Sequence, residues 1–165
     1  MVTLTALAKA ACKALNSNEI PVPLPDTHVI KLFECVAIEL TWLYINLPCL
    51  SQTFANETLC QNLRLHEHMV EMFDATCRIS HVLPGFEWCS ELKSNLLWAI
   101  INIIEENPTI LNETFFDFNL LKLILDDAKK LDSFDFKYLK RTFSLYETIC
   151  QHANTDLVHK CADYL

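Results

Sequence analysis

Two tryptophan–asparagine pairs have the residue types and the spacing to bind a cationic side chain. Trp42 and Asn46 are four residues apart, and so are Trp98 and Asn102. Residues four apart on a helix share a face, so each indole projects beside an amide. If both helices line one surface, the two indoles stand side by side, with a slot between them for the methylenes and ammonium of a lysine. The amides would hold an extended peptide backbone.

Acidic residues surround the second pair. Glu106 lies four residues after Asn102, where its carboxylate would pair with the bound ammonium. The chain has 13 Lys+Arg against 21 Asp+Glu, a net charge of −8, and nine of the acids lie between Glu91 and Phe136 beside four lysines. Such a surface repels phosphate and attracts a basic peptide. There are two alternatives. The acidic face could serve only to keep the protein soluble, and the tryptophans could serve only to pack in a core.

Other site chemistries lack the residues that they need. The single glycine, Gly85, cannot supply a phosphate-binding loop, and neither GxGxxG nor GxxxxGK[ST] is present. There is no CxxC pair, and the histidines are scattered, so we expect no metal site and no cofactor. No nucleophile has a recognisable base partner, which indicates that the protein is not an enzyme. No basic stripe is visible, so we expect no nucleic-acid partner.

The eight cysteines could suggest a secreted disulfide protein, and so could the sequons at Asn56 and Asn112. However, Lys9 and Lys13 interrupt the apolar run that a signal peptide requires. The cysteines lie within apolar helical runs, where free cysteine behaves as a small core residue. No stretch is long and apolar enough to span a bilayer. We expect a reduced, soluble, intracellular protein with eight free thiols and no membrane partner.

The elements that position the candidate site are predicted to be helices, because one glycine is too few for several β-hairpins. The fold class is therefore all-α. Apolar residues recurring at intervals of three and four predict a long helix over 28–47. A second long, apolar helix is predicted over 91–105, closed by Asn107 and Pro108, and a third long helix over 136–152. Shorter helices are predicted over 4–15, 54–62, 63–74, 109–115 and 118–130, with a Pro-containing linker over 20–25 and a last helix from Thr155.

The order of these helices repeats: one long helix is followed by two short ones. The two Trp–Asn pairs stand at equivalent places on the first two long helices, 56 residues apart, and Ser144 and Thr148 stand at the matching place on the third, 46 residues further on. A repeat of this kind cannot bury its apolar face alone, whereas stacked repeats form a continuous core with one concave side. We therefore predict an α-solenoid of about three three-helix repeats over residues 28–165, preceded by the N-terminal helix and linker of residues 1–27.

Several motifs resemble the armadillo repeats of the importin-α (karyopherin-α) family, adaptors that recognise nuclear localisation signals. Residues 98–104, WAIINII, resemble the family's W-A-L-x-N-I-A ending of a repeat. Residues 118–125, FNLLKLIL, resemble the helix that follows it, without its glycine, and residues 139–150 resemble L-R-N-x-t-W-t-L-S-N-l-C. Upstream, residues 39–46, ELTWLYIN, resemble the end of the second repeat, so the resemblance extends over residues 28–165.

The resemblance implies a right-handed superhelix that binds extended basic segments and takes part in nuclear protein import, in the cytoplasm and nucleus. By this resemblance, Trp42, Asn46, Trp98 and Asn102 line the signal-binding groove. Glu106 takes the place of the aspartate that pairs with the key lysine of the signal. Asn95, one turn before Trp98, stands where the family often has a polar groove residue.

Three departures from the family pattern bear on function. Ser144 and Thr148 replace the next tryptophan and asparagine, so one lysine slot is missing. The interval of 56 residues exceeds the armadillo repeat of about 40–47 residues, which predicts an insertion over 76–89. There is no basic N-terminal arm, so we expect no importin-β binding through this chain. The chain resembles a divergent, truncated relative, and a degenerate armadillo scaffold or regulatory interaction protein without signal binding is the alternative function.

Overall fold

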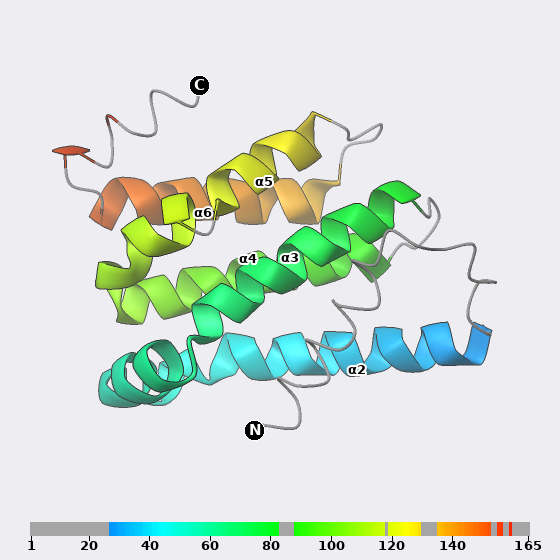
Figure 1. Ribbon diagram of the computed structural model, residues 1–165, viewed down its shortest axis with the longest axis horizontal. Coiled ribbons are helices and arrows are strands. Elements are labelled where there is room, and N and C mark those ends of the chain that lie inside the picture. Colours follow the sequence, from blue (N-terminus) through cyan, green and yellow to red (C-terminus); the bar gives the residue numbers. More distant parts are fainter. Residues whose placement is uncertain are drawn as a thin grey trace.

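The computed structural model describes residues 27–82, 88–117, 119–129 and 135–152, together with Thr155, Asp156 and His159 (Figure 1). These residues form helices joined by short turns, and no strand occurs among them. The protein is therefore all-α, as the sequence predicted. The helix expected over 4–15, the linker over 20–25 and most of the helix expected from Thr155 lie outside the described residues.

Four long helices form the frame of the fold: α2 (Thr27–Asn46), α3 (Leu65–Val82), α4 (Trp88–Glu106) and α6 (Phe136–His152). The shorter elements are α5 (Leu120–Ala128), the 3₁₀ turns η1 (Pro48–Leu50) and η3 (Pro108–Ile110), and the π-helical segments η2 (Phe54–Asn62) and η4 (Glu113–Asp117). The predicted ranges 54–62 and 136–152 coincide with η2 and α6, and the range 28–47 differs from α2 by one residue at each end.

Helices α2, α4 and α6 lie side by side in one row, with α4 in the middle (Figure 1). Between α2 and α4, Thr41 contacts Asn95 and Ile45 contacts Asn102, so contacts later in α2 are made with residues later in α4. The same holds between α4 and α6, where Ser94 contacts Lys137 and Glu105 contacts Thr148. The three helices are therefore parallel. Helix α3 packs against α4 from a second layer, and it also contacts α5 and η4.

The central position of α4 follows from its sequence, which is apolar on almost every side rather than along one stripe. Thirteen of its 19 residues are buried. Leu96, Leu97, Ile100, Ile103 and Ile104 are completely inaccessible to solvent. Because α2, α3 and α6 cover three sides of α4, only a narrow part of its surface remains open.

Within the described ranges, the helix ends are formed without glycine. Pro48 and Pro108 follow the last residues of α2 and α4 closely and open the 3₁₀ turns η1 and η3. Arg64 and Asn119 adopt left-handed backbone conformations, with φ of 46° and 58°, ahead of α3 and α5. Asn tolerates this conformation well. Asp135 caps α6, because its Oδ1 accepts hydrogen bonds from the backbone N–H groups of Lys137 and Tyr138 at 2.9 and 3.1 Å.

Of the segment 76–89, where the sequence predicted an insertion, residues 76–82 and 88–89 are helical, and residues 83–87 lie outside the described ranges. Helix α3 continues past its predicted end at residue 74 as far as Val82, and Trp88 and Cys89 open α4. Residues 76–82 therefore extend α3, and residues 88–89 begin α4. These residues do not separate the long helices of the row, since α2 packs directly against α4.

Six cysteines lie within the described residues, and all six are free thiols. Cys60, Cys77 and Cys89 are buried, and Cys35, Cys49 and Cys150 are exposed. The other two cysteines of the sequence, Cys12 and Cys161, lie outside the described residues.

Candidate functional site

The open side of α4 carries the second Trp–Asn pair. Trp98, Asn102 and Glu106 are half-buried there, and Glu91 and Glu105 are exposed. All five recur at helical spacing on one side of α4. We call the surface formed by Trp42, Asn46, Trp98, Asn102 and Glu106 the Trp strip. The fold thus brings residues of two helices, 56 positions apart in the sequence for the two tryptophans, onto one surface.

The two indoles of the Trp strip touch each other, but not in parallel. The ring centroids of Trp42 and Trp98 are 5.8 Å apart, and their planes meet at 69°. Aromatic rings prefer this edge-to-face arrangement over face-to-face stacking, because the positive edge of one ring meets the negative face of the other. The expectation of two parallel walls with a slot between them is therefore wrong for this conformation. Trp42 nevertheless remains 41% exposed.

A cation already lies on the Trp strip. The guanidinium carbon of Arg141, from α6, is 3.8 Å from the centroid of the Trp98 ring, well within the range of a cation–π interaction. Partial burial lowers the pKa of Arg141 from its usual value, although the group stays charged. The sequence analysis missed this residue. The sequence places Arg141 three residues before Ser144, on the same face of the predicted helix, but gives no sign of its contact with Trp98.

The three amides of the predicted site are engaged within the protein. Asn102 Nδ2 donates a hydrogen bond to the backbone carbonyl of Ile45 at 2.8 Å. Asn46 Nδ2 donates to the carbonyl of Trp42, in its own helix, at 2.7 Å. Asn95 is buried rather than lining a groove, and its Nδ2 donates to Thr41 Oγ1 at 3.4 Å. Asn95 and Asn102 therefore hold α4 against α2, whereas Asn46 remains exposed.

Two adjacent glutamates at the end of α4 differ in their surroundings. Glu105 accepts a hydrogen bond from Thr148 Oγ1 at 2.9 Å and contacts His152 Nε2 at 3.2 Å, so it joins α4 to α6. The carboxylate of Glu106 forms no ion pair with any cation of the described residues. Glu106 is thus the acid of the Trp strip whose charge a bound cation would neutralise.

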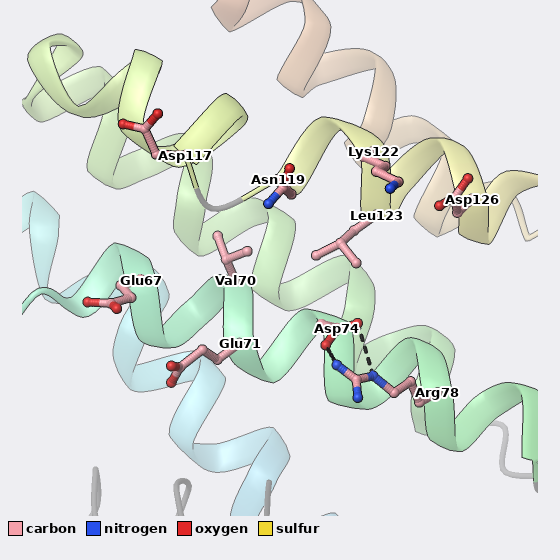
Figure 2. Close-up of a pocket in the computed structure, with 10 residues that line it drawn as sticks. All are labelled: Glu67, Val70, Glu71, Asp74, Arg78, Asp117, Asn119, Lys122, Leu123 and Asp126. Carbon is pink, nitrogen blue, oxygen red and sulfur yellow. Dashed lines mark hydrogen bonds and ion pairs between the residues drawn. The ribbon is translucent and has the colours of Figure 1, made fainter. Parts of the chain in front are cut away.

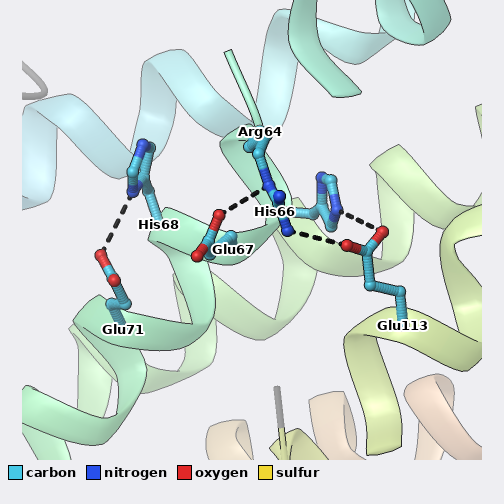
Figure 3. Close-up of polar contacts among 6 residues, drawn as sticks. All are labelled: Arg64, His66, Glu67, His68, Glu71 and Glu113. Atoms are coloured by element: carbon cyan, nitrogen blue, oxygen red, sulfur yellow. Dashed lines mark hydrogen bonds and ion pairs between the residues drawn. The ribbon is translucent and has the colours of Figure 1, made fainter. Parts of the chain in front are cut away.

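A second polar cluster joins the start of α3 to η4 (Figure 3). Arg64 contacts Glu67 at 2.7 Å and Glu113 at 2.8 Å, which stabilises its left-handed backbone. His66, only 2% exposed, contacts the other oxygen of Glu113 at 3.3 Å. Burial lowers the pKa of His66, and the attraction of Glu113 opposes that shift only in part. This cluster joins the turn at Arg64 to η4, with His66 buried and the Arg64 side chain at the surface.

An acidic groove lies between α3 and the η4–α5 segment, with a volume of about 460 Å³ (Figure 2). Five carboxylates line it, together with two cations, of which Arg78 is paired with Asp74. The acids are Glu67, Glu71, Asp74, Asp117 and Asp126. Because these residues come from α3, η4 and α5, the groove is separate from the Trp strip on α2, α4 and α6.

Two further findings concern metal binding and membranes. Within the described residues, no group of three or more His, Cys, Asp and Glu side chains is placed to hold a metal ion. Of the helices described, none is long and apolar enough to cross a membrane.

Comparison with known proteins yielded no relative. No protein-family model matches the chain, and neither the curated proteins nor the solved structures gave a match.

Proposed function

We propose that this protein is a protein-interaction module that binds an extended Lys/Arg-bearing segment on the Trp strip. The observation that carries the proposal is the guanidinium of Arg141 lying 3.8 Å from the Trp98 ring. The indole face attracts a cationic side chain of the kind that a basic partner would present. Trp42, which is 41% exposed, offers a second aromatic surface beside it.

Charge supports the same proposal. The protein has a net charge of −8, so its field attracts a basic segment from a distance. Glu91, Glu105 and Glu106 lie on the open side of α4 with Trp98. A bound ammonium would meet Glu106, whose carboxylate has no cationic partner among the described residues.

The family-level part of the proposal is an armadillo-type α-solenoid related to importin-α, with a role in nuclear protein import in the cytoplasm and nucleus. Its support is the resemblance of the motifs around Trp42 and Trp98, together with the parallel row of α2, α4 and α6. In such a solenoid each helix of the row would close one repeat. The row would then line the concave side, with about three repeats in this chain.

The second candidate is a scaffold of the same architecture that binds no signal. It is favoured by the Asn102 amide, which donates to the Ile45 carbonyl at 2.8 Å and so would have to leave α2 to reach a peptide backbone. In this function the Trp–Asn pairs serve to pack the helices of the row together.

A peptide titration separates the two candidates. The probe is a fluorescein-labelled peptide of alternating lysine and alanine, with a glutamate–alanine peptide as the negative control, both followed by fluorescence anisotropy at low salt. We expect the wild-type protein to bind the lysine peptide and Glu106→Lys to weaken binding by on the order of 2 kcal/mol, because the substitution places a like charge against the ammonium.

The matched control is Asp117→Lys, which makes the same change of charge in the separate acidic groove. It should lower the affinity only through the change in net charge, by much less than Glu106→Lys. If Asp117→Lys weakens binding and Glu106→Lys does not, the peptide binds in the acidic groove rather than on the Trp strip. An absence of binding to the wild-type protein would instead favour the scaffold.

A further inference from the structure

Arg141 and Trp98 belong to different helices, α6 and α4, and a cation–π contact joins them. The guanidinium carbon lies 3.8 Å from the ring centroid, which places the planar group against the face of the indole. Arg stacks on aromatic faces more effectively than Lys does, because its guanidinium is planar and weakly hydrated. Arg141 is half-buried.

The indole, rather than a salt bridge, holds Arg141. Among the described residues no carboxylate forms an ion pair with its guanidinium. Its neighbours on the exposed part of α6 are themselves basic, since Lys137 and Lys140 are both exposed there. Within the described part of the chain, the cation–π contact with Trp98 is therefore what holds the guanidinium of Arg141, and an incoming cation can replace it.

The Trp98 ring cannot hold Arg141 and a second cation on the same face. Trp42 contacts the same ring, at 5.8 Å between centroids, which further restricts access to it. An incoming lysine or arginine thus has to displace the guanidinium, and until it does so the two like charges repel each other.

We propose that Arg141 is the specificity-determining residue of the Trp strip: it occupies the indole face of Trp98 as an internal competitor, so that a basic segment binds only by displacing it. This inference rests on the proposed function. Displacement of Arg141 favours partners with several cationic side chains. One cationic side chain of the partner only replaces Arg141 on Trp98, whereas its other cations gain new contacts with Trp42 and Glu106.

The test uses the same labelled lysine–alanine peptide and compares four proteins: wild type, Arg141→Ala, Arg141→Lys and Lys140→Ala. A cation–π contact of ordinary strength corresponds to a change in affinity of roughly three- to thirty-fold. We therefore expect Arg141→Ala to bind the peptide roughly three- to thirty-fold more tightly than the wild type. Arg141→Lys keeps the charge but stacks less well, so its gain should be smaller.

Lys140→Ala is the matched control, because it removes the same charge from the adjacent, exposed position of α6. Circular dichroism and thermal unfolding establish that each variant keeps its fold. The proposal is overturned, with the proposed function intact, if the wild type binds and Arg141→Ala binds no more tightly, or if Lys140→Ala gives the same gain. If none of the four proteins binds the peptide, the proposed function itself fails and the inference falls with it.

Discussion

Lys93 is a charged residue of α4 that lies inside the fold. Its ammonium is 2.9 Å from a carboxylate oxygen of Asp127 in α5, and the two side chains are only 4% and 0% exposed. The ring of Tyr138, from α6, lies 4.9 Å from the ammonium. Burial raises the pKa of Tyr138 and that of Cys77 well above their usual values, and the nearby charge of Asp127 adds to both shifts. This cluster joins α3, α4, α5 and α6.

Removing one partner of this buried pair should be costly. We expect Asp127→Ala to lower the free energy of unfolding in urea by about 3–5 kcal/mol, because it leaves a buried ammonium unpaired. The double variant Lys93→Met, Asp127→Leu removes both charges and should recover most of that loss.

The control for the buried pair is Asp126→Ala. The pair of Asp126 with Lys129 lies at the surface, at 3.6 Å, so its loss should cost less than about 1 kcal/mol. Similar losses for Asp126→Ala and Asp127→Ala would show that burial of the Lys93 pair contributes nothing particular to stability.

At the scale of elements, a side chain of α4 supplies a hydrogen bond to the C-terminal end of α2. The last carbonyls of a helix have no hydrogen-bond donor within that helix. The Ile45 carbonyl, one residue before the end of α2, accepts a hydrogen bond from Asn102 Nδ2 at 2.8 Å. It also accepts one from Cys49 Sγ at 3.7 Å. The side chain that the sequence assigned to peptide binding therefore also caps a neighbouring helix.

Truncating this amide should weaken the contact between α2 and α4. Asn102→Ala leaves the Ile45 carbonyl without its strongest donor, so we expect a loss of about 1–2 kcal/mol in the free energy of unfolding. Asn46→Ala is the control, because the exposed Asn46 amide bonds only within its own helix and its loss should be close to neutral. An equal effect of the two substitutions would contradict the interhelical role of Asn102.

The helices themselves were largely predictable from the sequence, and their mutual contacts were not. Apolar spacing gave the ranges of α2, η2 and α6 to within one residue, because each helix has its own periodic pattern. The extension of α3 to Val82 was missed, since the pattern weakens after residue 76. The Trp strip was predicted as a surface, but the angle between its indoles and the position of Arg141 depend on how α2, α4 and α6 meet. Spacing along one helix contains no such information.

At the scale of the whole molecule, one helix holds the others together. Helices α2, α3 and α6 each pack against α4, while α5 reaches it through the Lys93–Asp127 pair. Because nearly all buried contacts of the row pass through α4, we expect the described helices to unfold as one cooperative unit rather than repeat by repeat.

The six described cysteines report on this cooperativity. Cys35, Cys49 and Cys150 are exposed, whereas Cys60, Cys77 and Cys89 are buried, one each on η2, α3 and α4. Burial raises the pKa of all three buried thiols, that of Cys89 to about 11, so almost none of each thiol is present as the reactive thiolate at neutral pH.

In the folded protein we expect a neutral thiol reagent to modify the exposed cysteines rapidly and the three buried cysteines only on unfolding. Peptide mass spectrometry over time assigns each rate, and in denaturant without reductant all eight cysteines of the sequence should react.

The relative rates of the three buried cysteines then distinguish cooperative from stepwise unfolding. If α4 holds the fold together, Cys60, Cys77 and Cys89 react at one common rate, and Asp127→Ala accelerates all three equally because it lowers the stability of the whole unit. Leu96→Ala, in the centre of α4, should do the same, since it opens a cavity at a completely buried position. Faster modification of Cys60 alone, with Cys77 and Cys89 unchanged, would mean that the first part of the chain unfolds by itself. The repeats would then be the stability units of the molecule, with α4 belonging to only one of them.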